Sequence, residues 1–300
     1  MATSLSSISI LWDDLFKSGK DTGNTTLKVS GSEGALAVKG ATTPFPSNLG
    51  IYMFNISTDV PYTRFLARLH QSMTFEWYME VGCRTGRSFA AVRGKTIAVD
   101  PFFRIKNDVI SEKPALLLLQ KKSDDFFASG LLESIGVKLS FSFLDGMHLM
   151  EFLLRDFMNT EKNSLPGGVI ALHDCCPFSF EMTTRDVENA PRDAWTGDVW
   201  KLIPILKKHR PDLKITVLGC KPTGLVFVHN LNPESKVLHS KYDEIVSEWQ
   251  DLTLEEYGVS KFNETFSYTP CESFVDGGYG IFDKVRLSVD SVAKPEFVSP

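Results

Sequence analysis

The sequence predicts an α/β protein with one mostly parallel sheet and helices on its faces. Short apolar runs, typical of buried strands, contain or end on an acidic residue at Glu80, Asp100, Asp145 and Asp174. Stretches with the helical spacing of apolar residues separate these runs. A turn with two glycines follows the first run and opens a helix. Strand, turn, helix and strand in this order form a βαβ unit, whose strands are parallel.

The βαβ unit lies in residues 77–101, WYMEVGCRTGRSFAAVRGKTIAVDP. Its turn contains Gly82 and Gly86, which let the backbone pass close to a ligand. Its second strand ends on Asp100, at the edge where open α/β sheets bind ligands and where a carboxylate can accept both hydroxyls of a ribose. The unit therefore predicts a nucleoside site. A dinucleotide-binding loop reads G-x-G-x-x-G, with three glycines, whereas this turn has two glycines that are four residues apart. An NAD-dependent oxidoreductase is therefore disfavoured.

The rest of the chain supplies the other elements of such a sheet. With the two strands of the βαβ unit, five further apolar or alternating runs give seven strands in all. Further strands are expected at residues 116–119, 139–143, 169–172, 214–218 and 224–228, and helices at residues 61–73, 149–158, 198–209 and 235–249.

The elements concentrate in the middle of the chain, which predicts one domain with two extensions. Residues 1–50 are rich in Ser, Thr and Gly and are expected to be an N-terminal extension with a small hairpin. Residues 51–257 carry the predicted sheet. Residues 258–300, with a glycine pair and several prolines, are expected to be an irregular C-terminal extension.

Composition excludes several classes of partner. A net charge of −5 argues against nucleic acid, which binds a basic face. No apolar run approaches the roughly 18–20 residues of a membrane span, and the start of the chain lacks the pattern of a secretory signal. Five cysteines, an odd number with two of them adjacent, do not fit a disulfide framework and favour a reducing compartment. The lack of a CxxC pair makes a structural zinc site unlikely. We therefore expect a cytoplasmic protein that binds neither nucleic acid nor a membrane, and leave a homo-oligomer open.

Two acids and a histidine form the predicted reactive group. Asp145 and Asp174 each end an apolar strand on either side of one crossover, which places both carboxylates at the edge that also carries Asp100. Two oxygen ligands of this kind suit Mg²⁺ or another divalent ion. His148 follows Asp145 by three residues, so its imidazole is expected to take a proton from a hydroxyl group in the same cleft.

These motifs resemble those of class I S-adenosylmethionine-dependent methyltransferases. Over about residues 60–230, the chain is similar to a group of these enzymes whose fourth strand reads DGxH and whose fifth ends HD, related to metal-dependent O-methyltransferases of sugars. The matching motifs are Glu80-x-Gly82-x-x-x-Gly86-x-Ser88, Asp145-Gly146-x-His148, Pro166-Gly167-Gly168 and His173-Asp174.

The resemblance implies a Rossmann-like methyltransferase fold and the transfer of a methyl group from S-adenosylmethionine to an oxygen of a small molecule, such as a sugar hydroxyl. It implies that Asp145 and Asp174 are metal ligands, with Mg²⁺ as a possible metal, and that His148 is a candidate catalytic base, with Asp145 beside it. The residues implied to contact the cofactor are Glu80, Gly82, Cys83, Arg84, Gly86, Ser88, Asp100, Ser123 (or Asp124) and Asp145.

One departure and several alternatives stay open. Some metal-dependent members carry a second acid where this chain has Cys175, a poor Mg²⁺ ligand. The metal is then bound weakly, has its coordination completed by another residue, or is absent. Asp145 and Asp174 could instead cap the helices that follow them. His148 could instead form a hydrogen bond with a neighbouring loop and take no part in the chemistry. A two-histidine iron site that includes His173 is disfavoured, because adjacent strand residues point to opposite faces.

A second function class also fits the nucleoside site. A protein that binds S-adenosylmethionine as a scaffold or regulatory subunit keeps the pocket between Gly82 and Asp100 without transferring a methyl group. Such a protein does not depend on His148 or Asp174, which distinguishes it from the enzyme.

Overall fold

A computed structural model describes residues 54–191 and 194–288 of the chain. The chain divides into two compact units, residues 1–52 and 53–300, and all described residues belong to the second. The hairpin predicted within residues 1–50 lies outside the described residues.

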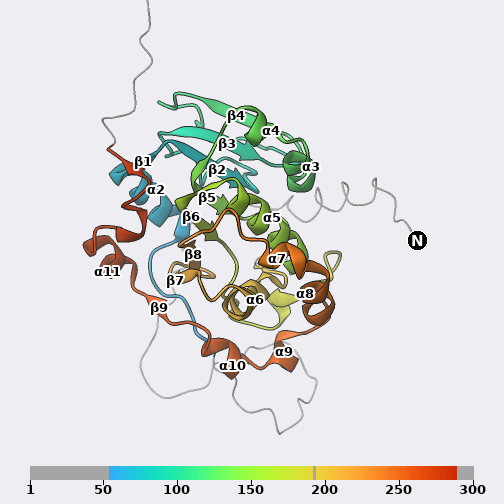
Figure 1. Cartoon of the computed structure of the whole chain (residues 1–300). Helices are drawn as coiled ribbons and strands as arrows, with labels where there is room; N and C mark the ends of the chain where they lie inside the picture. The colour runs from blue at the N-terminus through green and yellow to red at the C-terminus, as the bar shows by residue number, and fades with distance from the viewer. Residues whose placement is uncertain (1–53, 192–193, 289–300) are drawn as a thin grey trace, which may run out of the picture. The chain divides into compact units, whose positions relative to one another are not determined.

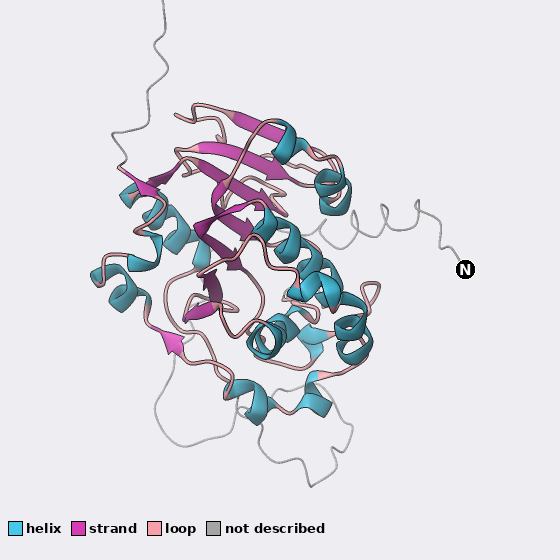
Figure 2. Ribbon diagram, viewed as in Figure 1, coloured by secondary structure: helices cyan, strands magenta, loops and turns pink. Residues whose placement is uncertain are grey.

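The core of the second unit is an eight-stranded sheet in the order β4-β3-β2-β5-β6-β8-β7-β9 (Figures 1 and 2). The prediction of seven strands was one too low, because β9 is only two residues long and has no apolar pattern of its own. The strands are β2 (Trp77–Val81), β3 (Lys95–Val99), β4 (Leu116–Leu119), β5 (Leu139–Leu144), β6 (Ser164–Leu172), β7 (Lys214–Leu218), β8 (Leu225–His229) and β9 (Tyr268–Thr269).

Strand direction confirms the Rossmann-like methyltransferase fold. The five strands from β4 to β6 run parallel to one another. Strand β8 is antiparallel to both of its neighbours, β6 and β7. The carboxyl ends of β2, β3, β5 and β6 therefore meet at one edge of the sheet, where ligands of open α/β sheets bind.

Helices cover both faces of this sheet. In Figures 1 and 2, α5, α6 and α8 lie on one face and α2 and α11 on the other. The expected helix at residues 235–249 is divided into α7 and α8. The α-helices are α2 (Tyr62–Ser72), α3 (Ser123–Ala128), α4 (Leu131–Ser134), α5 (Met150–Lys162), α6 (Leu202–His209), α7 (Val237–Ser240), α8 (Tyr242–Trp249), α9 (Leu254–Tyr257), α10 (Val259–Asn263) and α11 (Cys271–Asp276).

Two hydrophobic clusters fill the space between the sheet and these helices. Because side chains alternate along a strand, β8 sends Val226 and Val228 into the cluster beneath α5 and α6. Its Leu225 and Phe227 enter the opposite cluster, which Phe65 of α2 completes. Burial on both faces explains why the central strands read as continuous apolar runs.

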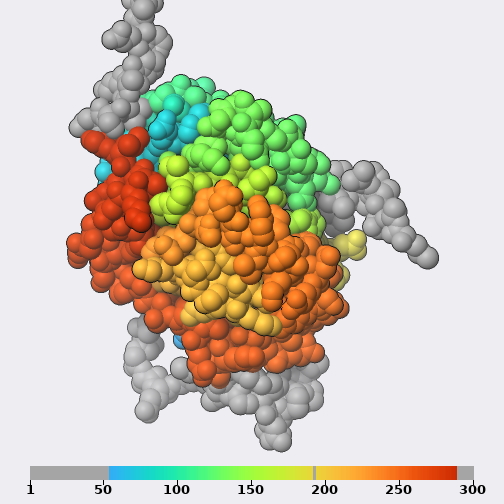
Figure 3. Space-filling model, in the orientation of Figure 1, coloured from blue at the N-terminus to red at the C-terminus, as the bar shows by residue number. Residues whose placement is uncertain are grey.

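The segment after α8 packs onto the rest of the described chain. Residues Phe262, Cys271 and Phe282 are buried in the two clusters. In the space-filling view, the orange and red segments lie in close contact with their neighbours (Figure 3). A short ladder pairs β1 (Thr74–Phe75) with β10 (Arg286–Leu287). Three 3₁₀ turns complete the described elements, at Glu181–Thr183, Val199–Lys201 and Gly280–Phe282. Within the described residues, no helix is long and apolar enough to span a membrane.

Candidate functional site

Three of the predicted acids follow parallel strands that end on the same side of the sheet. Asp100 follows β3, Asp145 follows β5, and Asp174 lies two residues past β6. The backbone N–H of Asp145 donates to the Val81 carbonyl of β2, which extends the sheet by one residue at this point. The carboxyl edge of the sheet therefore carries an acid from each of three strands, as the sequence predicted.

Asp174 has a left-handed backbone conformation, with φ of 58°. This conformation interrupts the alternation of strand β6, so the side chains of His173 and Asp174 both face Asp145. The Nδ1 atom of His173 lies 3.1 Å from Asp145 Oδ1 and 3.3 Å from Asp174 Oδ2. The expectation that adjacent residues here point to opposite faces was wrong, because the strand ends at Leu172.

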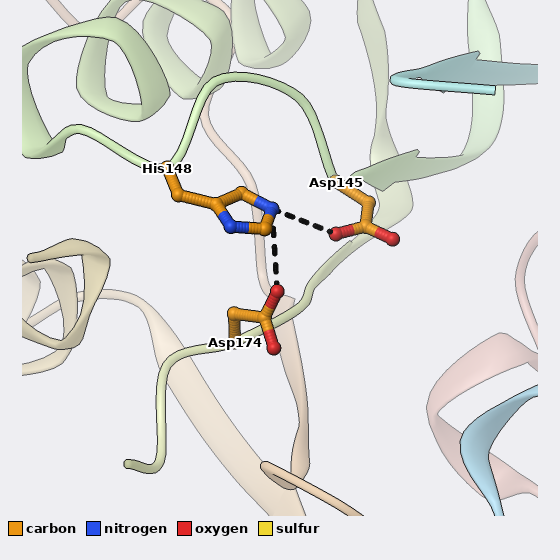
Figure 4. A group of neighbouring side chains, drawn as sticks. All are labelled: Asp145, His148 and Asp174. Atoms are coloured by element: carbon orange, nitrogen blue, oxygen red, sulfur yellow. Dashed lines mark ion pairs between the residues drawn. The ribbon is translucent and has the colours of Figure 1, made fainter. Parts of the chain in front are cut away.

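Asp145, His148 and Asp174 form one compact group (Figure 4). The Nε2 atom of His148 lies 3.5 Å from Asp145 Oδ1 and 3.2 Å from Asp174 Oδ2. One ligand atom from each of the three side chains lies within 4.8 Å of the others, a spacing suited to a metal ion. The structure thus brings together the three residues that the motifs assigned to metal binding and to the base.

A loop before α6 holds the His148 imidazole in place. Its Nδ1 lies 2.8 Å from the Trp195 carbonyl, which can only accept, so neutral His148 carries its proton on Nδ1. The Nε2 lone pair then faces the two acids. Gly197 has φ of 52°, and a Cβ there would lie 1.7 Å from the His148 carbonyl oxygen, so only glycine allows this close packing.

A buried ion network anchors the same loop. Asp198 accepts a hydrogen bond from the Met150 N–H at the start of α5 and pairs with Lys201 at 2.7 Å. Arg185 pairs with Asp198 and also with Glu151 of α5, at 2.7 Å. Ion pairs therefore connect the loop that carries Trp195 to α5, the helix that follows His148.

The electrostatics of the group favour positive charge. Burial alone would lower the pKa of His173, but the carboxylates of Asp174 and Asp145 outweigh it and raise that pKa to about 10. The same balance raises the pKa of His148. Burial opposes ionisation of Asp174, yet the two histidines hold its pKa well below the usual value. A proton or a metal cation is thus strongly attracted to this position.

Thr223 and Tyr62 support the group from the side, and the motifs did not predict either residue. The Thr223 hydroxyl donates to Asp174 Oδ1 at 2.7 Å and lies 3.5 Å from His173 Nε2. The Tyr62 ring packs against the His173 imidazole with 3.9 Å between ring centroids. Both contacts join residues far apart in sequence, so only the folded chain reveals them.

The glycine turn fits tightly against neighbouring segments. Gly82 has φ of 88°, and a Cβ there would lie 1.9 Å from the Asp145 carbonyl oxygen. Gly86 has φ of 79°, and a Cβ there would lie 2.4 Å from a methyl group of Val109. Glycine is required at both positions by the fold of the chain itself.

Asp100 is oriented by this turn. Its Oδ2 accepts from the Arg84 N–H at 2.7 Å and its Oδ1 from the Phe102 N–H at 2.6 Å. Each carboxylate oxygen has further acceptor capacity, so the group can still receive two hydroxyls. The side chain is held in one orientation, as a ribose ligand requires.

The other residues assigned to the cofactor take different positions. Glu80 is fully buried and accepts from the Tyr78 and Ser88 hydroxyls, and burial raises its pKa to about 8. The Cys83 thiol points inward and donates to the Glu80 carbonyl. Ser123 starts α3 beside the buried Asp156. The side chains of Ser88, Cys83 and Ser123 thus interact within the protein, and Glu80 anchors the turn.

Comparisons with known proteins add a likeness in structure. No family model matches the chain, and no curated protein sequence matches it. Cofactor-bound Rv0187 from MTB is 14% identical with a TM-score of 0.42, over 60% of this chain and 84% of that one. The O-methyltransferase TomG from Streptomyces achromogenes, in complex with SAM, is 17% identical with a TM-score of 0.38, over 57% of this chain and 78% of that one.

The MycE methyltransferase from the mycinamycin biosynthetic pathway, in complex with Mg, SAH and mycinamycin VI, is 13% identical with a TM-score of 0.38, over 58% of this chain and 49% of that one. TomG and MycE are both methyltransferases. At such low identities and TM-scores, the likeness carries no argument about what this chain does.

Proposed function

We propose that this protein is an S-adenosylmethionine-dependent methyltransferase that acts on an oxygen of a small molecule. One observation carries the proposal. Gly82, in the turn before Asp100, packs directly against the carbonyl of Asp145 in the acidic group. A nucleoside held by Asp100 and an acceptor held by the acidic group would therefore lie side by side, as direct transfer between them requires.

The cofactor side is supported by the orientation of Asp100. Its carboxylate is fixed by two backbone N–H groups and retains acceptor capacity for the two ribose hydroxyls. The turn between Gly82 and Gly86 would pass the methionine end, with Glu80 holding its shape through Ser88. A sulfonium cofactor needs no phosphate loop, which fits the missing third glycine.

The acceptor side is supported by the acidic group. Asp145 and Asp174 would hold a divalent cation, which supplies Lewis acidity that makes an acceptor hydroxyl easier to deprotonate. The His148 imidazole, oriented by the Trp195 carbonyl, would take the hydroxyl proton at Nε2. The half-buried Trp195 ring lies 5.1 Å from the His148 ring and offers an apolar wall for a sugar or similar acceptor.

The cellular setting follows from the chemistry of the chain. All five cysteines are free and buried, which supports a reducing compartment such as the cytoplasm. Cys175 and Cys176 keep their protons, because burial raises the pKa of both thiols, so neither is a nucleophile here.

Calorimetric titration with S-adenosylhomocysteine tests the cofactor half of the proposal. We expect micromolar binding to the full chain and a loss of at least about tenfold in Asp100→Asn, which keeps the shape of the side chain but replaces one acceptor oxygen with an NH₂ donor. Asp243→Asn, on the exposed side of α8, is the matched control. Absence of binding to the wild-type chain would contradict the proposal.

Methyl transfer to a panel of hydroxylated small molecules tests the other half. Turnover that depends on His148 and Asp174 supports the enzyme. Binding without turnover, unaffected by His148→Gln and Asp174→Asn, would favour a cofactor-binding scaffold instead. Binding of a nicotinamide dinucleotide in place of S-adenosylhomocysteine would favour an oxidoreductase.

A further inference from the structure

The acidic group has a fourth member, His173, which the motifs did not assign to any role. Its Nδ1 contacts the same two oxygen atoms that face His148, at 3.1 Å from Asp145 Oδ1 and 3.3 Å from Asp174 Oδ2. An octahedral ion with bonds of about 2.1 Å places adjacent ligand atoms about 3 Å apart. The contacts of His173 have nearly this spacing.

The two histidines differ in how they are held. The His173 side chain is 6% exposed, and the Tyr62 ring and Thr223 fix it from two sides. The His148 side chain is 21% exposed, so a bound acceptor can reach it and a proton can leave it. A metal ligand is held in place by packing and by outer hydrogen bonds, whereas a base must come within reach of the acceptor hydroxyl. His173 therefore suits a ligand and His148 a base.

The second ring nitrogen of His173 is also placed as in a metal ligand. Such histidines usually donate their other N–H to an acceptor that fixes the tautomer. His173 Nε2 faces the Thr223 hydroxyl oxygen, and that hydroxyl donates its own proton to Asp174. A metal ion bound here would displace the proton that His173 Nδ1 shares with Asp145 and Asp174, and the proton on Nε2 would then face Thr223.

The geometry points to a metal site formed by Asp145, His173 and Asp174, with one imidazole nitrogen and two carboxylates, that prefers a first-row transition-metal dication to Mg²⁺. Mg²⁺ takes oxygen ligands, whereas imidazole suits Fe²⁺, Co²⁺, Ni²⁺ and Zn²⁺. The expectation of Mg²⁺ or another divalent ion rested on the two acids alone. The nitrogen ligand changes the class of metal.

Cys175, which stands where some relatives carry a second acid, does not complete the site. It is fully buried, and its thiol donates to the His173 carbonyl. The set of ligands is completed instead by the residue before Asp174, because the left-handed backbone at Asp174 turns His173 toward Asp145.

The inference deepens the proposed function, since it names the metal that would hold the acceptor oxygen. Metal binding can nevertheless be measured without cofactor or acceptor. A chain that binds metal as inferred but fails to bind S-adenosylhomocysteine would contradict the proposed function and leave the metal site standing. The reverse result would overturn the metal site alone.

Titration of the full, metal-free chain with Co²⁺ and with Mg²⁺, followed by calorimetry and by the visible absorption of Co²⁺, tests the inference. We expect Co²⁺ to bind at least about 100-fold more tightly than Mg²⁺. His173→Asp places an oxygen at the position of Nδ1, two bonds beyond Cβ, so it should reduce this preference at least about tenfold and change the Co²⁺ spectrum.

Two further variants keep the result decisive. His173→Asn offers an oxygen without added charge and should show the same reduced preference even if His173→Asp does not fold. His148→Gln should leave the preference within about threefold of wild type, because His148 is not a ligand in this assignment. An unchanged preference in His173→Asn, or a loss that appears in His148→Gln instead, would overturn the inference.

Discussion

Gly82 and Asp145 join the two halves of the candidate site: a Cβ at Gly82 would lie 1.9 Å from the Asp145 carbonyl oxygen. The first glycine of the turn before Asp100 therefore contacts the backbone of a candidate metal ligand. The Asp145 N–H completes the contact by donating to Val81, directly before Gly82. Because backbone atoms meet here, a side chain at Gly82 cannot be accommodated by a rotamer change.

We predict that Gly82→Ala lowers the free energy of unfolding by at least about 3 kcal/mol, since it adds a backbone clash to the cost of a left-handed alanine. Gly130→Ala is the control, because Gly130 has φ of 64° but no atom lies within 4 Å of the point that its Cβ would occupy. That variant should lose only about 1 kcal/mol. Urea denaturation of both variants checks the difference, and equal losses would show that the Asp145 contact is unimportant.

The buried carboxyl of Asp156 should make stability depend on pH. Burial raises its pKa to about 7, and its Oδ1 has no hydrogen-bond partner among the described residues. As pH rises above about 4, the unfolded chain releases this proton while the folded chain keeps it until about pH 7. The contribution of Asp156 to stability is therefore greatest at low pH and is lost as pH rises toward 7.

We predict that Asp156→Asn is more stable than wild type at pH 8 by roughly 2–4 kcal/mol and that the gain disappears near pH 4. Asp243→Asn, at an exposed position, serves as the control and should shift stability little at either pH. Thermal unfolding measured at both pH values checks the sign. A gain that is equal at both would rule out titration of Asp156 as its cause.

The network around Arg185 should keep the His148 imidazole in its tautomer. Arg185→Ala leaves Glu151 and Asp198 without this cation and loosens the loop that carries the Trp195 carbonyl. We predict that the His148 Nδ1–H resonance, protected from solvent in wild type, exchanges at least about tenfold faster in the variant. Nitrogen-15 NMR of labelled histidine measures this, and Arg185→Lys should preserve part of the protection. Equal exchange in all three proteins would show that the network does not act on His148.

The sequence was sufficient to predict that acids lie at the carboxyl end of the sheet. The strand patterns place Asp100, Asp145 and Asp174 at the same end of parallel strands. It was insufficient for His173. Its orientation depends on the left-handed backbone at Asp174. An aspartate adopts that conformation only uncommonly, so the residue type alone does not predict it. The orienting contact from Thr223 spans 49 residues and depends on how β8 returns beside β6.

Thr223 should control the affinity of the metal site through Asp174. Its buried hydroxyl donates to Asp174 Oδ1, which leaves Oδ2 facing His148 and His173. Thr223→Val keeps the shape of the side chain and removes this hydrogen bond, so Asp174 is free to rotate. Outer contacts of this kind typically contribute roughly 10- to 100-fold to metal affinity, and we predict a loss of about that size for Co²⁺. Thr183→Val removes a similar hydroxyl that bonds to the Phe180 carbonyl and should leave the affinity unchanged. Calorimetry with both variants measures the effect, and an equal affinity in Thr223→Val and wild type would show that Asp174 is held without Thr223.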